Sequence, residues 1–190
     1  TVQQQNWPAV VVELLEVYRR LALATETEIA ALTRKLEQAA EEHLPPSMPV
    51  LPQGFGELSL ETLRREVCDW SRFHNRGNVG SFFGMCCAES SSGEQQNQGS
   101  ITKTGNPRGR HALIELAWRA LHFQPEYWVV KKFKPRMDQA KPRSVARKKI
   151  IVAMARLIAV DLWRLYTGQT TLAKLGLKAK TGKEYVLESV

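Results

Sequence analysis

The stretch that decides the fold is residues 10–43, VVVELLEVYRRLALATETEIAALTRKLEQAAEEH. Mostly apolar side chains recur along it with a four-three spacing, and neither proline nor glycine interrupts the run. Such a heptad seam predicts one helix, about 50 Å long, that packs along a partner helix. The partner is a second copy or a helix outside this sequence; the alternative is a helix lying on its own domain. The seam positions are Val11, Leu15, Tyr18, Ala22, Thr25, Ile29, Leu32, Leu36, Ala39 and His43.

A proline-rich linker follows the long helix and leads into a second helical region. Pro45, Pro46, Pro49 and Pro52 end the first helix, because proline cannot continue the backbone hydrogen bonding. Gly54 and Gly56 then form a turn before a helix predicted over 59–68. Helix, Gly-x-Gly turn and helix together indicate a helix-hairpin-helix, whose turn amides can approach a phosphate. The alternative is a pair of glycines kept for packing.

The rest of the chain predicts further helices and shows no alternating strand pattern of any length. Helices are expected over 79–85 with Asn78 as cap, over 110–123, and over 144–166, whose buried stripe contains Ile151, Met154, Ile158, Leu162 and Leu165. Residues 86–109 are expected to be a long loop, 124–143 to be irregular, and 172–190 to fray or form a small hairpin. The expected fold is therefore mostly α, with domains at 1–48 (coiled-coil helix and linker), 49–168 (compact helical domain) and 169–190 (tail).

The predicted loop contains the serine cluster Ser90-Ser91-Ser92-Gly93, followed by a polar run to Gly99. A serine beside glycine offers a hydroxyl nucleophile with little steric cover. By composition alone, however, such a loop is more often a solvated linker than an active site.

Charge is distributed unevenly along the chain. The formal net charge is +8, and residues 101–190 hold 19 basic and six acidic side chains. This asymmetry predicts a polyanionic partner, with nucleic acid favoured over an anionic membrane surface. Pro135 and Pro142 interrupt the amphipathic pattern that a membrane-surface helix needs. No apolar run is long enough to span a membrane.

The three cysteines, Cys68, Cys86 and Cys87, lack the paired spacing of a zinc site, so no metal site is expected. They indicate reduced thiols in an intracellular protein. The chain begins at Thr1 rather than Met, which suggests a fragment or a processed product.

The order of the motifs resembles the C-terminal transposase domain of the insertion-sequence one-ten family. The motifs are Pro52-Gln53-Gly54-Phe55-Gly56, Asp69-Trp70-Ser71-Arg72-Phe73, Gly84-Met85, Ser91-Ser92-Gly93 and Gly99-Ser100-Ile101-Thr102-Lys103-Thr104-Gly105-Asn106. The resemblance covers residues 51–166, and the long helix fits the connecting coiled coil of the family.

This resemblance implies a serine recombinase that is guided by a structured bridge RNA. It places the nucleophile at Ser92, with Ser91 as the fallback, and implies a covalent phosphoserine link to DNA during recombination. The family also has an N-terminal RNase-H-like domain with four acidic residues that bind Mg²⁺, and nothing in this chain matches that domain. No cofactor is therefore expected in this chain. A cytoplasmic, nucleoid-associated prokaryotic protein follows from the same resemblance.

Basic side chains after the serine cluster are the candidates for holding DNA and guide RNA, and a non-catalytic nucleic-acid-binding module is the alternative function. A structural assembly domain built around the long helix is a third possibility. Each basic residue, considered by itself, could instead be a solvated surface charge that contacts no nucleic acid. The nucleic-acid-binding candidates are Gly54, Gly56, Lys103, Arg108, Arg110, Lys131, Lys132, Lys134, Arg147 and Lys148.

Overall fold

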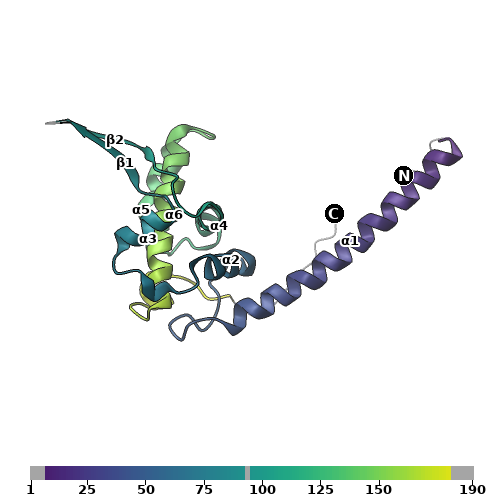
Figure 1. Ribbon diagram of the computed structural model, residues 1–190, viewed down its shortest axis with the longest axis horizontal. Coiled ribbons are helices and arrows are strands. Elements are labelled where there is room, and N and C mark those ends of the chain that lie inside the picture. The colour runs from purple at the N-terminus through teal and green to yellow at the C-terminus, as the bar shows by residue number, and fades with distance from the viewer. Residues whose placement is uncertain (1–6, 93–94, 181–190) are drawn as a thin grey trace.

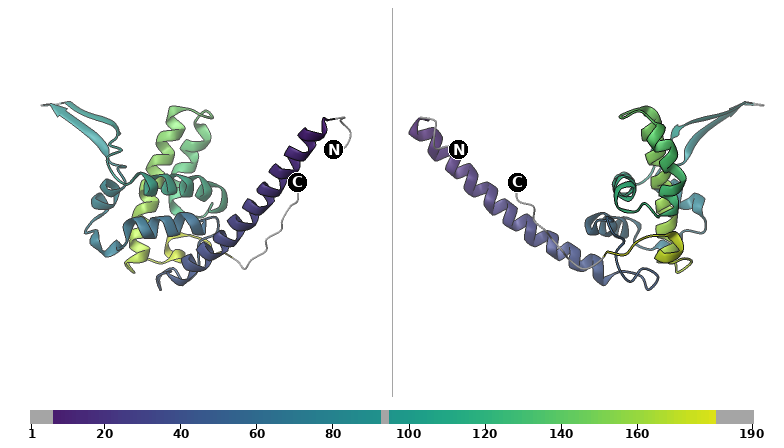
Figure 2. Two further views of the ribbon diagram at one scale, coloured as in Figure 1. Left: turned by 45° about the vertical axis from the view of Figure 1, so that its right-hand side comes forward. Right: turned by 180° about the vertical axis from the view of Figure 1, so that it is seen from behind.

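Figure 1 shows the computed structural model of the chain, which describes residues 7–92 and 95–180. Within these residues the structure holds helices α1 to α7, one short 3-10 helix and a single two-stranded sheet. The prediction of a mostly α fold is confirmed. The helices from α2 onward gather into one body, and α1 leads away from it (Figures 1 and 2).

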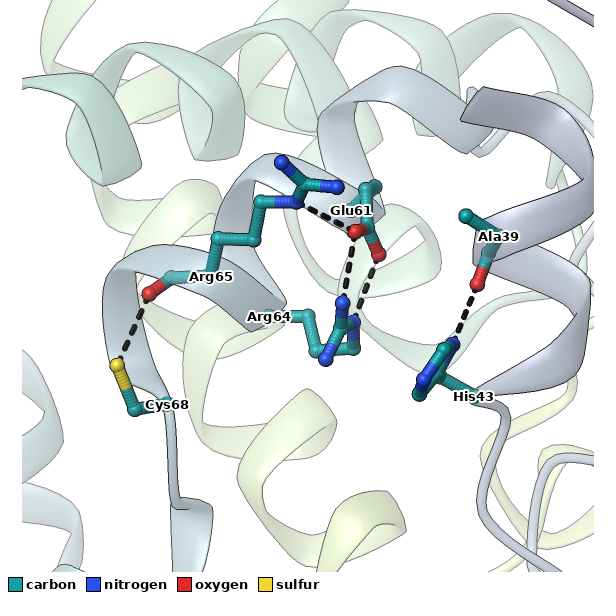
Figure 3. Close-up of polar contacts among 6 residues, drawn as sticks. All are labelled: Ala39, His43, Glu61, Arg64, Arg65 and Cys68. Atoms are coloured by element: carbon teal, nitrogen blue, oxygen red, sulfur yellow. Dashed lines mark hydrogen bonds and ion pairs between the residues drawn. The ribbon is translucent and has the colours of Figure 1, made fainter. Parts of the chain in front are cut away.

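Helix α1 (Ala9–Glu42) confirms the predicted long helix. At its C-terminal end, next to the helical body, His43 bonds through Nδ1 to the carbonyl oxygen of Ala39, 2.7 Å away, which satisfies one of the orphan carbonyls at the helix end (Figure 3). Most of its apolar side chains are exposed within this chain, so its partner remains a prediction. The exposed large side chains are Val10, Val12, Leu14, Leu15, Val17, Tyr18, Leu21, Leu23, Ile29 and Leu32.

Helix α2 (Glu57–Val67) starts two residues before the predicted boundary and buries Leu60, Leu63 and Val67. A buried carboxylate lies on the same helix. Glu61 is 2% exposed and accepts hydrogen bonds from Arg64 (Nε 2.7 Å, Nη2 2.8 Å) and from Arg65 (Nε 2.6 Å), as Figure 3 shows. The hydrogen bonds from Arg64 outweigh burial and hold the pKa of Glu61 at about 2.

The core lies between α4 (Pro107–Phe123) and α6 (Val145–Tyr166). Each helix begins at a side-chain cap: Asn106 Oδ1 accepts from the Gly109 amide at 2.8 Å, and Ser144 Oγ accepts from the Arg147 amide at 3.2 Å. All five residues of the stripe predicted for 144–166 are buried, which confirms that face of the helix.

Helix α5 (Trp128–Gln139) corrects the expectation of an irregular segment at 124–143. The apolar residues that it buries recur with helical spacing, and they outweigh the one proline, Pro135, within the helix. Its first turn is joined to α6 through Asp161, which is 2% exposed. Tyr127 Oη and Trp128 Nε1 both donate to Asp161 Oδ2 at 2.6 Å. Burial raises the pKa of this carboxyl, although both hydrogen bonds oppose the shift.

Helix α3 (Arg76–Phe82) begins three residues earlier than expected. Asn75, not Asn78, is the cap: its Oδ1 accepts the Asn78 amide at 3.0 Å, and its extended backbone ends the preceding segment. The predicted cap therefore lies inside the helix. The 3-10 helix Trp70–Arg72 precedes α3 and brings Trp70 to stack on Tyr166, with ring centroids 5.1 Å apart.

A β-hairpin replaces the long loop expected at 86–109. Strand β1 (Cys87–Ser92) pairs antiparallel with β2 (Gln95–Ile101). The sequence from position 89 to 100 has no apolar residue, so the alternation that predicts a half-buried strand is absent. The prediction missed these strands for that reason.

The tail is more ordered than expected as far as residue 180. A short helix, α7 (Leu172–Leu175), ends at Gly176, whose φ of +74° is a left-handed conformation that suits glycine. Ala179 then pairs with Pro52 through an isolated bridge. The remainder of the predicted tail, 181–190, lies outside the described residues.

Candidate functional site

The hairpin carries the predicted nucleophile at its far end. It extends away from the helical body (Figures 1 and 2). Ser92 pairs with Gln95, and Ser91 pairs with Gln96, at the end of the ladder farthest from the helices. The structure describes the backbone of these two serines, and their side chains lie outside the described residues. The arrangement places both candidate serines on one strand, one residue apart.

A bulge lies in the proximal part of the hairpin. Cys87 pairs with Ile101, and the next pair is Glu89 with Gln98. Two residues on β2 therefore lie opposite one on β1. Such a bulge bends a ribbon and increases its twist, and bulges are common beside active sites because they redirect a strand.

Backbone hydrogen bonds hold the base of the hairpin to the turn after α3. The Thr102 amide donates to the Cys86 carbonyl at 2.9 Å, and the Lys103 amide donates to the Gly84 carbonyl at 3.1 Å. Gly105 lies so close to this turn that a Cβ there would be 2.5 Å from the Gly84 nitrogen. The two chain segments thus meet backbone to backbone, and no side chain fits between them.

Arg110, predicted to clamp a phosphate, lies at this base. Its Nη1 donates to the Phe83 carbonyl at 2.9 Å and to the Lys103 carbonyl at 3.3 Å. The guanidinium therefore joins α4 to both segments that lead into the hairpin. Lys103 itself is exposed, with a backbone φ of +57°. The structure brings these two predicted residues together, with Arg110 half-buried and Lys103 on the surface.

Asn106 and Glu66 complete the base, and sequence reasoning did not single them out as site residues. Asn106 caps α4 and also donates through Nδ2 to Glu66 Oε2 at 2.5 Å. Arg108, a predicted nucleic-acid ligand, has Nη1 3.6 Å from Glu66 Oε1 while remaining 82% exposed. The motif Thr104-Gly105-Asn106 before an apolar helix was the available signal for a cap, but the contact with α2 spans 40 residues.

The Gly-x-Gly turn packs against the end of α4. Gly54 has a φ of +79°, and a Cβ there would lie 2.5 Å from the Phe123 ring. Its carbonyl accepts from Arg119 Nε. Gly56 takes the N-cap position of α2, and Glu57 in the first turn pairs with Lys180. Burial opposes this pair, yet the hydrogen bond from Lys180 lowers the pKa of Glu57. The described contacts of Gly54 are therefore close packing on Phe123 and one hydrogen bond from Arg119.

The predicted basic residues of α5 and α6 fall into two groups. Lys131 pairs with Glu126 at 2.6 Å and Lys134 with Asp138 at 3.0 Å, so a carboxylate already neutralises each. A second group has no carboxylate partner among the described residues, and we call its surface, where α5 ends and α6 begins, the basic end. It consists of Arg136, Lys141, Arg143, Arg147, Lys148 and Lys149.

Lys132 lies elsewhere on α5, with Nζ 5.8 Å from the Trp128 ring centroid and 5.7 Å from that of Phe133. Its charge faces aromatic rings rather than a carboxylate.

Neither a metal cluster nor a membrane span is found over residues 7–92 and 95–180. No group of three histidine, cysteine or acidic side chains comes together there as a metal ligand set. None of the described helices combines the length and apolar character needed to cross a bilayer.

The residues of the described site are similar to those of a known transposase family. A model of the transposase IS116/IS110/IS902 family matches residues 52–131, which include the glycine turn, the hairpin and α4. The resemblance inferred from the motif order is confirmed by this match, because the motifs that carry it lie mostly within residues 52–131.

Two curated relatives come from Sinorhizobium fredii. "Putative transposase y4rJ" is 32% identical over 153 residues, covering 80% of this chain and 37% of that protein. "Putative transposase y4qE" is 35% identical over 66 residues, covering 35% of this chain and 17% of that protein. The chain thus spans little more than a third of the length of the first relative and about a sixth of the second.

Proposed function

We propose that this chain is the part of a transposase that cleaves and rejoins DNA, with Ser92 as the nucleophile and Ser91 as the fallback. The observation that carries the proposal is the serine pair at the far end of a projecting hairpin, within a domain of a transposase family. A projecting strand end can reach a DNA phosphate while the helical body stays outside the duplex.

In the proposed step, Ser92 Oγ attacks a DNA phosphorus atom. The bond from Oγ to phosphorus forms, and the bond from phosphorus to one deoxyribose oxygen breaks. The Oγ proton passes to a general base, and the deoxyribose oxygen takes up a proton and leaves as the hydroxyl end of the cleaved strand. Serine is a weak nucleophile at its ordinary pKa, so the step needs both this base and positive charge beside the phosphate. Lys103 and Arg108 are exposed next to the hairpin base, a strand length from Ser92, so we assign them to other phosphates of the same DNA and not to the one attacked.

The family resemblance extends this proposal to partners outside the chain. A bridge RNA guides the reaction, and Mg²⁺ is held by an RNase-H-like domain in another part of the full-length protein. Lys131, Lys132, Lys134, Arg147 and Lys148 are the further residues proposed to hold DNA or guide RNA. A cytoplasmic protein associated with the nucleoid is the expected location.

Assembly through α1 is a further part of the same proposal. Ten large apolar side chains of this helix are exposed within the chain, which is the composition of a helix that packs along another. We propose a second copy as its partner. Sedimentation of the chain alongside a variant with Leu15, Ile29 and Leu32 changed to Glu tests this assembly, which predicts a larger species for the unchanged chain alone.

The decisive experiment traps a covalent protein–DNA adduct on denaturing gels, using the full-length transposase with its RNA and Mg²⁺. Ser92→Ala is expected to abolish the adduct, and Ser90→Ala, two positions away on the same strand, serves as the control that keeps it. An adduct that still forms when Ser92→Ala and Ser91→Ala are combined would show that neither serine is the nucleophile.

A non-catalytic nucleic-acid-binding module is the second candidate function, and the unpaired charges of the basic end favour it. A module of this kind should form no covalent adduct even with all its serines unchanged. Its binding to nucleic acid should weaken steeply as the salt concentration rises. A protein that only assembles through α1 predicts weak binding and little salt dependence, so a salt titration separates these two alternatives.

A further inference from the structure

Trp118 lies on the outer side of α4 and is 42% exposed. The tryptophans elsewhere in residues 44–180 serve the core: Trp70 is 4% exposed, Trp163 is 9% exposed, and Trp128 donates its indole N–H to Asp161. Trp118 faces away from the buried stripe of its own helix, which contains Leu113, Leu116 and Ala120. A large ring placed there leaves part of its apolar surface in contact with water.

A cation lies over this ring. The guanidinium carbon of Arg147, in the first turn of α6, is 5.5 Å from the Trp118 ring centroid. Arg147 forms no ion pair within the described residues, so its charge remains available to an anion. Aromatic surface and unpaired positive charge thus lie side by side.

The charges beside Arg147 do not stabilise the helix that carries them. Ser144 caps α6, and the first turn contains no acidic residue. Arg147, Lys148 and Lys149 instead add positive charge near the positive end of the helix dipole, where carboxylates are favoured. An anion lying against the basic end would offset this repulsion.

We propose that Trp118 and Arg147 form a stacking site for an unpaired base of DNA, with Lys148 and Arg143 of the basic end holding the flanking phosphates. Single-stranded nucleic acids are bound by this combination, in which bases stack on aromatic rings and cations follow the backbone. That the strand is DNA rests on the proposed function. The stacking of an unpaired base is argued from the aromatic ring and the cation alone. The basic end and the hairpin project towards the same side of the helical body (Figures 1 and 2).

Two physical arguments favour an unpaired strand over other occupants. A base in a duplex has both faces covered by its neighbours, so it cannot stack on Trp118 without leaving the helix. A protein partner would have to bury Arg147, Lys148 and Lys149 and supply carboxylates for each. A single strand brings an aromatic face and regularly spaced negative charges together.

The test measures binding of the 190-residue chain to a dye-labelled dT12 strand by fluorescence anisotropy, over a series of salt concentrations. Trp118→Leu is expected to weaken binding roughly tenfold, the size of one stacked base, and Trp118→Phe by less than threefold. The slope of log K against log salt stays unchanged in both variants, because stacking releases no counterions. Lys148→Gln is expected to reduce the slope by about 0.7.

Trp7→Leu is the matched control, because Trp7 is 47% exposed and has no described cation over its ring. It is expected to leave binding unchanged. A blunt duplex carrying the same number of phosphates should lose less than twofold with Trp118→Leu. An equal loss for strand and duplex, or more than tenfold tighter binding of U12 RNA than of dT12, would overturn the proposal.

Crosslinking of the unmodified chain removes any dependence on a variant that fails to fold. A dT12 strand with one 5-iodouracil, irradiated in the complex, is expected to give a crosslinked peptide that contains Trp118. A crosslink confined to other aromatic residues would refute the site. The readouts do not involve Ser92, so failure of the adduct experiment and failure of this proposal are separate outcomes.

Discussion

Replacing Glu61 by Gln tests whether one buried carboxylate secures α2. The Glu61 carboxylate is 2% exposed and accepts three charge-assisted hydrogen bonds, from Arg64 and Arg65 (Figure 3). These bonds hold its pKa at about 2, against 4.5 for an unperturbed glutamate. At 1.36 kcal/mol per pKa unit, the ionised form contributes about 3 kcal/mol to the free energy of unfolding at pH 7.

The sign of the pH dependence follows from this lowered pKa. The contribution is fully present above the unfolded pKa of 4.5 and is lost as the pH falls towards the folded pKa of about 2. At pH 3 roughly 1.5 kcal/mol of it remains. Glu61→Gln should therefore lower the unfolding free energy by about 3 kcal/mol at pH 7, and by about half as much at pH 3.

Urea unfolding followed by tryptophan fluorescence, repeated between pH 7 and pH 3, measures this difference. Glu16→Gln is the matched control, because Glu16 also pairs with an arginine three residues away, at 3.0 Å, but is 55% exposed. An exposed pair contributes under about 0.5 kcal/mol, so the control should change little. Equal effects of the two substitutions, or a Glu61→Gln effect that does not vary with pH, would refute the reasoning.

Three further substitutions probe other parts of the structure. Tyr127→Phe removes a donor 2.6 Å from the buried Asp161 and should cost about 2 kcal/mol in thermal or urea unfolding, whereas a loss under about 0.5 kcal/mol would contradict the contact. Gly105→Ala places a Cβ 2.5 Å from the Gly84 nitrogen and 2.6 Å from the Phe82 carbonyl oxygen, so the full-length protein should lose DNA joining and melt at a lower temperature; retained joining with an unchanged melting temperature would argue against a tight base. Ser144→Ala removes the cap of α6 and should cost about 1 kcal/mol by thermal unfolding, with an unchanged melting temperature as the contrary result.

The helices that could be predicted are those whose apolar spacing is continuous. The stripe from Ile151 to Leu165 repeats for four turns, and the structure buries it as expected. Helix α5 has an equally good spacing, but Pro135 and the lysines around it favoured an irregular segment. Tertiary packing of Val129, Val130 and Phe133 overrides that local preference.

The site was less predictable than the helices, because its polar residues have no periodicity and its contacts are distant in sequence. The serines could be chosen by their motif, whereas the strand that carries them gave no apolar pattern. The two bonds from Arg110 join residues that lie 27 and seven positions away, and charge alone suggested a phosphate ligand. Only the folded backbone shows that this guanidinium meets carbonyl groups at the hairpin base.

The hairpin acts as a lever with its pivot at that base. A six-residue strand is about 20 Å long, so a tilt of about 5° at the pivot moves its far end by roughly 2 Å. Displacements of about 1 Å can cost a reaction a hundredfold in rate. Small shifts of Gly105, Asn106 or Arg110 would therefore produce larger displacements of the serine end of the hairpin. None of these three residues needs to contact DNA for this to happen.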